Sequence, residues 1–149
     1  MKCNRHSIRL KDYDYTTPWW YYVTICTDDH KLTFGKIKNG KVELNHLGKI
    51  ANECWQNIPE HFPQTVLDYY IIMPNHIHGI TVINSRGTTC RALTTTNLHY
   101  TNNEESFGKP VKGSLPMILR SYKAAVTKRI NEIKKTDRGI VCKEIISNV

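Results

Sequence analysis

The chain has 149 residues, of which 40% are hydrophobic, and a formal net charge of +8. This length suits one domain around one core, and the hydrophobic content argues against wholesale disorder. No apolar run approaches the roughly 20 residues of a bilayer-spanning helix, and no apolar segment follows the polar N-terminus. We therefore expect a single domain over residues 1–149, located in the cytoplasm and without a membrane partner.

The cysteines and the charge narrow the class of protein further. Five cysteines stand far apart in the sequence without a Cys-x-x-Cys pair, which argues against a disulfide framework and a zinc knuckle. The excess of positive charge favours a polyanionic partner, because it raises the local concentration of phosphate groups. A basic surface that serves only solubility would have the same composition, so charge alone does not establish nucleic-acid binding.

The first third of the chain predicts a strand and a hairpin. Residues 19–27 are rich in aromatic and β-branched side chains, which favours a strand. At least half of the aromatic run 19–22 should face a core, and the rest are candidates for stacking on bases. Residues 32–44 predict a hairpin around Asn39-Gly40, because a type I′ turn needs positive φ at both central residues.

A helix is predicted next, with Asn45 as its N-cap. Its apolar residues recur at spacings of three and four, which places on one face Leu47, Ile50, Ala51, Cys54, Trp55 and Ile58. Pro59 and Pro63 limit its continuation. Residues 65–73 and 76–83 then predict two strands, joined by a turn at Pro74-Asn75.

The last third predicts a long variable loop at about residues 84–112, followed by a helix capped by Ser114. The expected buried face of this helix comprises Leu115, Ile118, Tyr122, Val126, Ile130 and Ile133. The final ten residues form either a short strand or a loose tail. The order of elements fits an α+β fold, a ferredoxin-like antiparallel sheet with helices packed on it.

The sharpest local pattern is His76-Ile77-His78, because side chains alternate along a strand and the two imidazoles then project from one face. Their Cβ atoms would lie within about 7 Å, close enough to share a cation. Ile77 would point into the core. Ile80 and Val82 continue the histidine face, which suggests the edge of a buried surface, and Gly79 would let another group approach closely.

Two readings of the histidine pair stay open at this point. Histidine pairs with one spacer also arise by chance as hydrogen-bonded residues without a ligand. In the functional reading, two neutral imidazoles leave open positions on a divalent ion, which can polarise a phosphate oxygen for attack by a hydroxyl nucleophile. Imidazole suits Mn²⁺ better than Mg²⁺.

The segment Met73-Pro74-Asn75-His76-Ile77-His78-Gly79-Ile80 resembles the HUH motif of single-tyrosine transposases. It is most similar to the REP-associated branch of the insertion-sequence-200-like family. The likeness extends in order over residues 4–15, 22–27, 47–63 and 121–131, so that it covers the chain from about residue 4 to residue 133.

This resemblance implies a ferredoxin-like fold, with His76 and His78 as metal ligands on a central strand and a requirement for Mg²⁺ or Mn²⁺. It implies binding of single-stranded or hairpin DNA, and strand cleavage and rejoining through a 5′-phosphotyrosine. Relatives in the wider family form dimers, which makes a homodimer a further expectation.

The sequence departs from the family at its C-terminal end. The family's nucleophilic tyrosine and a further metal ligand lie on a later helix, and residues 138–149 contain no tyrosine. We therefore expect a truncated or frameshifted copy, whose exposed sheet face is covered by residues 140–146 or by a second chain. Tyr122 is a candidate substitute nucleophile, although its place on the predicted buried stripe favours a core aromatic. Tyr69 and Tyr70 lie on the predicted strand before the motif, where one should face the core and the other is a remote candidate.

Basic residues in two segments are candidates for phosphate contacts. They are Arg5, Arg9 and Lys11 near the N-terminus, and Arg120, Lys123, Lys128 and Arg129 on the predicted second helix. A solvated charged face is the alternative for all of them. Three functions therefore remain: an HUH transposase, a non-catalytic module that binds DNA hairpins, and a generic ferredoxin-like RNA-binding or interaction domain.

Overall fold

The computed structural model describes residues 13–84, 110–135 and 141–148. Arg5, Arg9 and Lys11, and most of the predicted variable loop, lie outside these ranges. Among the described residues, no helix has both the length and the hydropathy needed to cross a bilayer.

Four antiparallel strands form the main sheet in the order β4-β5-β1-β6, with the bounds β1 (Trp20–Thr27), β4 (Thr65–Ile72), β5 (His76–Ile83) and β6 (Val141–Asn148). The principal helices are α1 (His46–Gln56), between β1 and β4 in the chain, and α3 (Leu115–Lys134), between β5 and β6. This βαββαβ order confirms the predicted α+β, ferredoxin-like fold. Smaller elements are η1 (Asp28–His30), β2 (Gly35–Lys38), β3 (Lys41–Leu44) and α2 (Ile58–His61).

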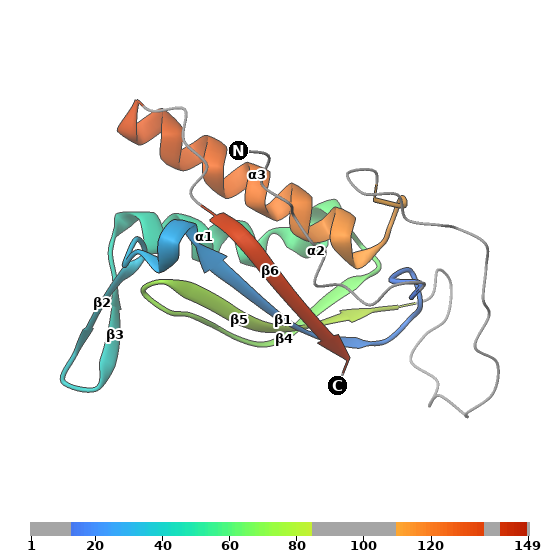
Figure 1. The fold of residues 1–149 in the computed structure, drawn as a ribbon. Coiled ribbons are helices and arrows are strands. Elements are labelled where there is room, and N and C mark those ends of the chain that lie inside the picture. Colours follow the sequence, from blue (N-terminus) through green and yellow to red (C-terminus); the bar gives the residue numbers. More distant parts are fainter. Residues whose placement is uncertain (1–12, 85–109, 136–140, 149) are drawn as a thin grey trace, which may run out of the picture.

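Both long helices lie on the same side of the sheet (Figure 1). Between them and the sheet lies one hydrophobic core, to which β1 contributes Tyr21, Val23 and Ile25, and α3 contributes Leu115, Ile118, Leu119, Tyr122, Val126 and Ile130. We call this side of the sheet the covered face, and the opposite side the open face.

The local elements agree closely with the sequence. The β2–β3 turn has positive φ at Asn39 (50°) and Gly40 (72°), as a type I′ turn requires. The Asn45 side chain accepts a hydrogen bond from the Gly48 amide at 2.9 Å, which confirms it as the N-cap of α1.

Ser114 occupies the predicted N-cap position of α3, without a capping hydrogen bond from its side chain. Two details of the predicted packing are wrong. Ile133 is 49% exposed, because it lies near the end of α3 beyond the reach of the sheet. Only Tyr21 of the aromatic run 19–22 is buried; the neighbouring Trp20 is 46% exposed.

The C-terminal segment forms a strand rather than a cover. β6 pairs with β1 along the edge of the sheet, with Thr24 opposite Ile145 and Val23 opposite Ile146. Ile146 is buried on the covered face, and Ile145 is 51% exposed. The expectation that this segment covers a sheet face is therefore wrong for residues 141–146, because they extend the sheet instead.

Candidate functional site

The histidine pair lies on the open face, at the start of strand β5. Burial alternates along this strand, with Ile77 fully buried on the covered face and His76 and His78 half-buried on the other. Antiparallel pairing with β1 sets Cys26 opposite His76 and Thr24 opposite His78. Alternation along a strand, as the sequence predicts, thus places both imidazoles on one surface.

The two imidazole rings are in direct proximity. Their centroids are 4.5 Å apart and their planes are inclined by 72°. Burial lowers the pKa of His76, and the neighbouring His78 and His30 add to this effect. A lowered pKa keeps the His76 ring neutral near pH 7, which is the form that can donate a lone pair to a cation.

Hydroxyl groups of strand β1 hold the ring of His78. Its Nδ1 lies 2.8 Å from the Tyr22 hydroxyl oxygen and 2.9 Å from Thr24 Oγ1. The Tyr22 ring also stacks on the imidazole, with centroids 5.5 Å apart and planes inclined by 22°. When Nδ1 carries the proton and donates to these oxygens, Nε2 keeps its lone pair.

His76 is held in the same way by its neighbour in sequence. Its Nδ1 lies 2.7 Å from Asn75 Oδ1, an atom that can only accept. In the tautomer with the proton on Nδ1, this nitrogen donates to Asn75 Oδ1 and Nε2 keeps its lone pair for a ligand. Partners that fix one ring nitrogen and free the other are the arrangement that histidine metal ligands need.

The donor set fits a cation in part. Two imidazole nitrogens suit a divalent transition metal such as Mn²⁺. Within residues 13–84, 110–135 and 141–148, no group of three or more His, Cys, Asp or Glu side chains could hold a metal. The pair would therefore leave several coordination positions to water and to an anionic ligand.

The open face around the histidines is largely apolar and accessible. The exposed fraction is 46% for Trp20, 37% for Tyr22, 48% for Ile71 and 51% for Ile145. Ile80 and Val82 are half-buried there, so the histidines do not lie at the edge of a buried surface as expected. An extended exposed apolar surface of this kind usually contacts a ligand or partner.

Tyr122 lies on the covered face, away from the histidines. Its hydroxyl donates to the Ala51 carbonyl at 3.1 Å, and its ring packs edge-on against Trp55. Burial raises its pKa well above the ordinary value of 10. Because the sheet separates this hydroxyl from His76 and His78, Tyr122 cannot act as a nucleophile at that site and is a core residue.

Gly79 also serves the core rather than a ligand. A Cβ atom at this position would collide with the Trp55 indole, so the missing side chain lets the ring pack against the strand. Trp55 is fully buried. The close approach that the sequence suggests is therefore made by Trp55 from the covered side.

The predicted phosphate-binding residues on α3 are remote from the histidines, because α3 covers the other face of the sheet. Arg129 is engaged with Glu53, whose Oε2 lies 2.8 Å from its guanidinium. This ion pair raises the pKa of Arg129. Arg120 and Lys123 have partners as well, and Lys128 is exposed.

Three partners of the histidine rings escaped the sequence analysis: Tyr22, Thr24 and Asn75. Asn75 precedes His76 directly, so the pattern Asn-His was the available signal. Tyr22 and Thr24 alternate along β1 as the histidines alternate along β5, but only the strand register shows that they meet.

Fold and site together define a class: a ferredoxin-like α+β domain with a pair of histidines on the open face of its sheet. No family model matches the chain. A solved structure described as a REP-associated tyrosine transposase bound to a REP hairpin superposes with a TM-score of 0.55 at 9% identity. The superposition covers 100% of this chain and 62% of that one, and it shows a shared fold.

The curated sequences establish a family. The chain is 38% identical over 128 residues to an uncharacterized protein of Haemophilus influenzae. The matched region spans 83% of this chain and 67% of that relative. The chain belongs to the same family as this Haemophilus protein.

Proposed function

We propose that this protein is a DNA-binding domain of the HUH transposase type, in which His76 and His78 hold a divalent cation against a phosphodiester of single-stranded or hairpin DNA. The fold shared with a transposase bound to a DNA hairpin supports the class of protein. The net charge of +8 supports a polyanionic partner.

One observation carries the proposal: the two imidazole rings are adjacent, and each has its Nδ1 within hydrogen-bond distance of a neighbouring oxygen. When Nδ1 carries the proton on both rings, both Nε2 atoms keep a lone pair for a ligand. Hydroxyl and amide partners of this kind orient metal-binding histidines. A divalent cation at this position would polarise a non-bridging phosphate oxygen. Tyr22, Thr24 and Asn75 would then act as positioning residues for the rings.

The exposed aromatic side chains beside the pair suit the same partner. Trp20 and Tyr22 lie on the open face, where unpaired bases can stack on them. Stacking of this type contributes about 1–3 kcal/mol per base and is largely independent of sequence. The open face therefore combines a phosphate-binding group with surfaces for bases.

A second candidate function is binding without cleavage. Tyr122 is excluded from the site by burial, and the Tyr22 hydroxyl hydrogen-bonds the Nδ1 side of His78, away from the Nε2 that would face a cation. Neither of these two tyrosines is placed to attack a phosphate held by the pair. Their placement is the observation that makes a DNA-hairpin-binding module the second candidate.

The metal site is tested by adding Mn²⁺ to the protein and following the histidine ring signals by nuclear magnetic resonance. We expect paramagnetic broadening of His76 and His78, abolished in His76→Ala. His46→Ala and His61→Ala are matched controls, because both residues are exposed and outside the pair. Equal broadening of all histidines would contradict a specific site.

Cleavage and binding are separated by one further experiment. Labelled hairpin DNA is incubated with Mn²⁺ and the protein, then analysed on a denaturing gel and, in parallel, by fluorescence anisotropy. A covalent adduct that disappears in His76→Ala supports the transposase, whereas salt-dependent binding without an adduct supports the module. RNA binding as tight as DNA binding and indifferent to the histidines would overturn both.

A further inference from the structure

The β2–β3 hairpin, residues 35–44, is a two-stranded ribbon with two different faces. Its register pairs Lys36 with Glu43 and Lys38 with Lys41, so these four side chains share one face. Ile37 pairs with Val42 on the other face. All three lysines are exposed, and the face of three lysines and one glutamate has a net charge of +2.

The base of the ribbon is fixed to the histidine motif. Phe34, directly before β2, is fully buried, and its amide donates to the Pro74 carbonyl at 2.9 Å. The Thr27 amide donates to the Asn75 carbonyl at 3.0 Å beside it. The ribbon is therefore attached within two residues of His76 and has a defined place relative to the pair.

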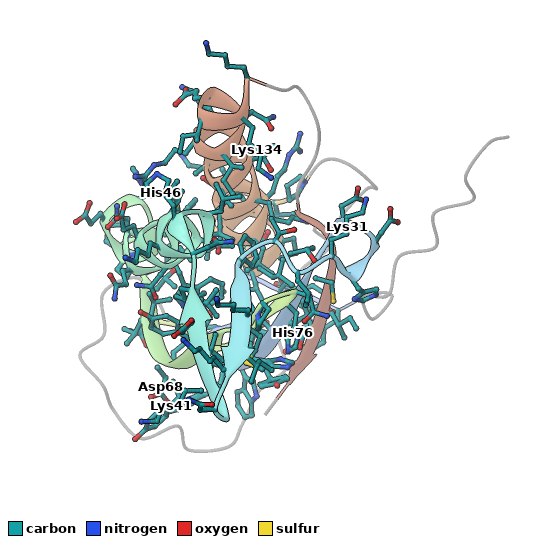
Figure 2. All side chains as sticks on the ribbon, turned by 90° about the vertical axis from the view of Figure 1, so that its left-hand side faces the viewer. Lys31, Lys41, His46, Asp68, His76 and Lys134 are labelled. Carbon is teal, nitrogen blue, oxygen red and sulfur yellow. The ribbon has the colours of Figure 1, made fainter. Side chains whose placement is uncertain are left out.

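From this base the ribbon extends away from the helices, beyond the main sheet, on the side of the open face (Figure 1). Figure 2 shows the same arrangement in the perpendicular view, with Lys41 far from Lys134 at the end of α3. The ribbon thus stands beside the open face, whereas the cations of α3 lie on the other side of the sheet.

The charges of the ribbon leave an excess of positive charge on the lysine face. Glu43 lies 3.7 Å from Lys36 and 3.8 Å from Lys38, so one carboxylate is shared by two lysines. Lys38 and Lys41 are direct cross-strand partners, and like charges in this position repel. A bound polyanion would offset the repulsion between these two lysines.

We propose that this ribbon binds the double-stranded stem of a DNA hairpin, with Lys36, Lys38 and Lys41 on its phosphates, while the unpaired end of the same DNA lies at His76 and His78. The inference rests on the proposed function and adds a second contact surface to it. A two-stranded ribbon fits the major groove of B-DNA, which is about 12 Å wide.

A duplex suits this surface better than a single strand. The aromatic side chains that stack on unpaired bases lie on the open face, and the ribbon strands contain none. The exposed lysines of one ribbon face match the phosphates that line a groove of duplex DNA. Stem and unpaired end would therefore be recognised by two different parts of the molecule.

The experiment compares two DNA probes, a hairpin with an unpaired end and the same unpaired end without the stem, by fluorescence anisotropy at several salt concentrations. Lys38→Gln/Lys41→Gln should weaken hairpin binding about tenfold and reduce the salt slope by about 2, since each lost phosphate contact removes about 0.9. Binding of the stemless probe should change less than about twofold. The matched control is Lys128→Gln/Lys134→Gln on α3, which removes the same charge and should leave both probes unaffected.

A variant that should strengthen DNA binding serves as a control for folding defects. Glu43→Gln removes the only negative side chain of the ribbon's lysine face and should tighten hairpin binding about threefold, which a misfolded protein would not do. Equal losses for the ribbon and α3 variants, or for the two probes, would overturn the ribbon as a stem-binding element. Wild-type protein that binds neither probe would overturn the proposed function itself, whereas hairpin binding unaffected by the ribbon variants would overturn only this inference.

Discussion

The two faces of the main sheet are built from alternate residues of the same strands, and they differ in chemistry. Along β5, the covered face presents Ile77, Gly79, Thr81 and Ile83, all buried by the helices. The open face presents His76, His78, Ile80 and Val82, all half-buried. Adjacent residues therefore have different tasks: one set holds the fold together, and the other is available to a ligand.

The largest expected difference in the free energy of unfolding is between substitutions of two adjacent residues on opposite faces. Ile77→Ala should lower the free energy of unfolding by about 2–5 kcal/mol, because it leaves a cavity in the core. His78→Ala should cost no more than about 1.5 kcal/mol, the scale of a lost hydrogen bond, while it removes the Mn²⁺ response. Urea unfolding measures both values, and equal losses would show that the faces are not distinct.

Gly79 tests how tightly the covered face is packed. Gly79→Ala places a methyl group against the Trp55 indole and should destabilise the protein by about 1–3 kcal/mol. In Trp55→Phe, whose ring is smaller, the same change should cost less, because the two residues are in contact. Additive losses in this double-mutant cycle would contradict the packing described for the strand.

The pH dependence of the free energy of unfolding tests whether Tyr122 belongs to the core. Its raised pKa means that its contribution to stability is fully present below pH 10 and is lost as the pH rises towards the folded-state pKa, because the unfolded chain ionises first. Tyr122→Phe should cost about 1 kcal/mol at pH 8. Above pH 10, the stability of this variant should fall less steeply than that of the wild type. Unfolding curves between pH 8 and 11 measure the difference.

DNA binding by Tyr122→Phe provides the functional side of this test. The variant should bind hairpin DNA as the wild type does, because the sheet separates this residue from the histidines. Loss of DNA binding in a stably folded variant would show that Tyr122 contributes to the DNA-binding site.

Arg129 should have the smallest effect. Arg129→Gln breaks its ion pair with Glu53, a contact between partly exposed groups worth less than about 1 kcal/mol. Hairpin affinity should change less than about twofold, because α3 lies on the covered side. A clear loss of affinity with an unchanged melting temperature would show that DNA also contacts α3.

Local features of the fold were predictable because short-range physics specifies them. Asn39-Gly40 adopts positive φ wherever a tight hairpin forms, and an asparagine before an amphipathic segment caps a helix through its own side chain. The order of strands and helices then restricted the architecture to few choices. The burial of Ile133 was predicted wrongly because hydrophobic periodicity does not show where a helix extends beyond the sheet on which it packs.

For the candidate site, the sequence by itself determined that His76 and His78 share one side of a strand, because alternation is a property of the strand backbone. Only the tertiary structure decided which groups surround them. Strand register set Tyr22 and Thr24 at His78, and the packing of α3 placed Tyr122 and the basic helix across the sheet. Register and packing depend on contacts between residues far apart in the chain, which no local pattern of residues encodes.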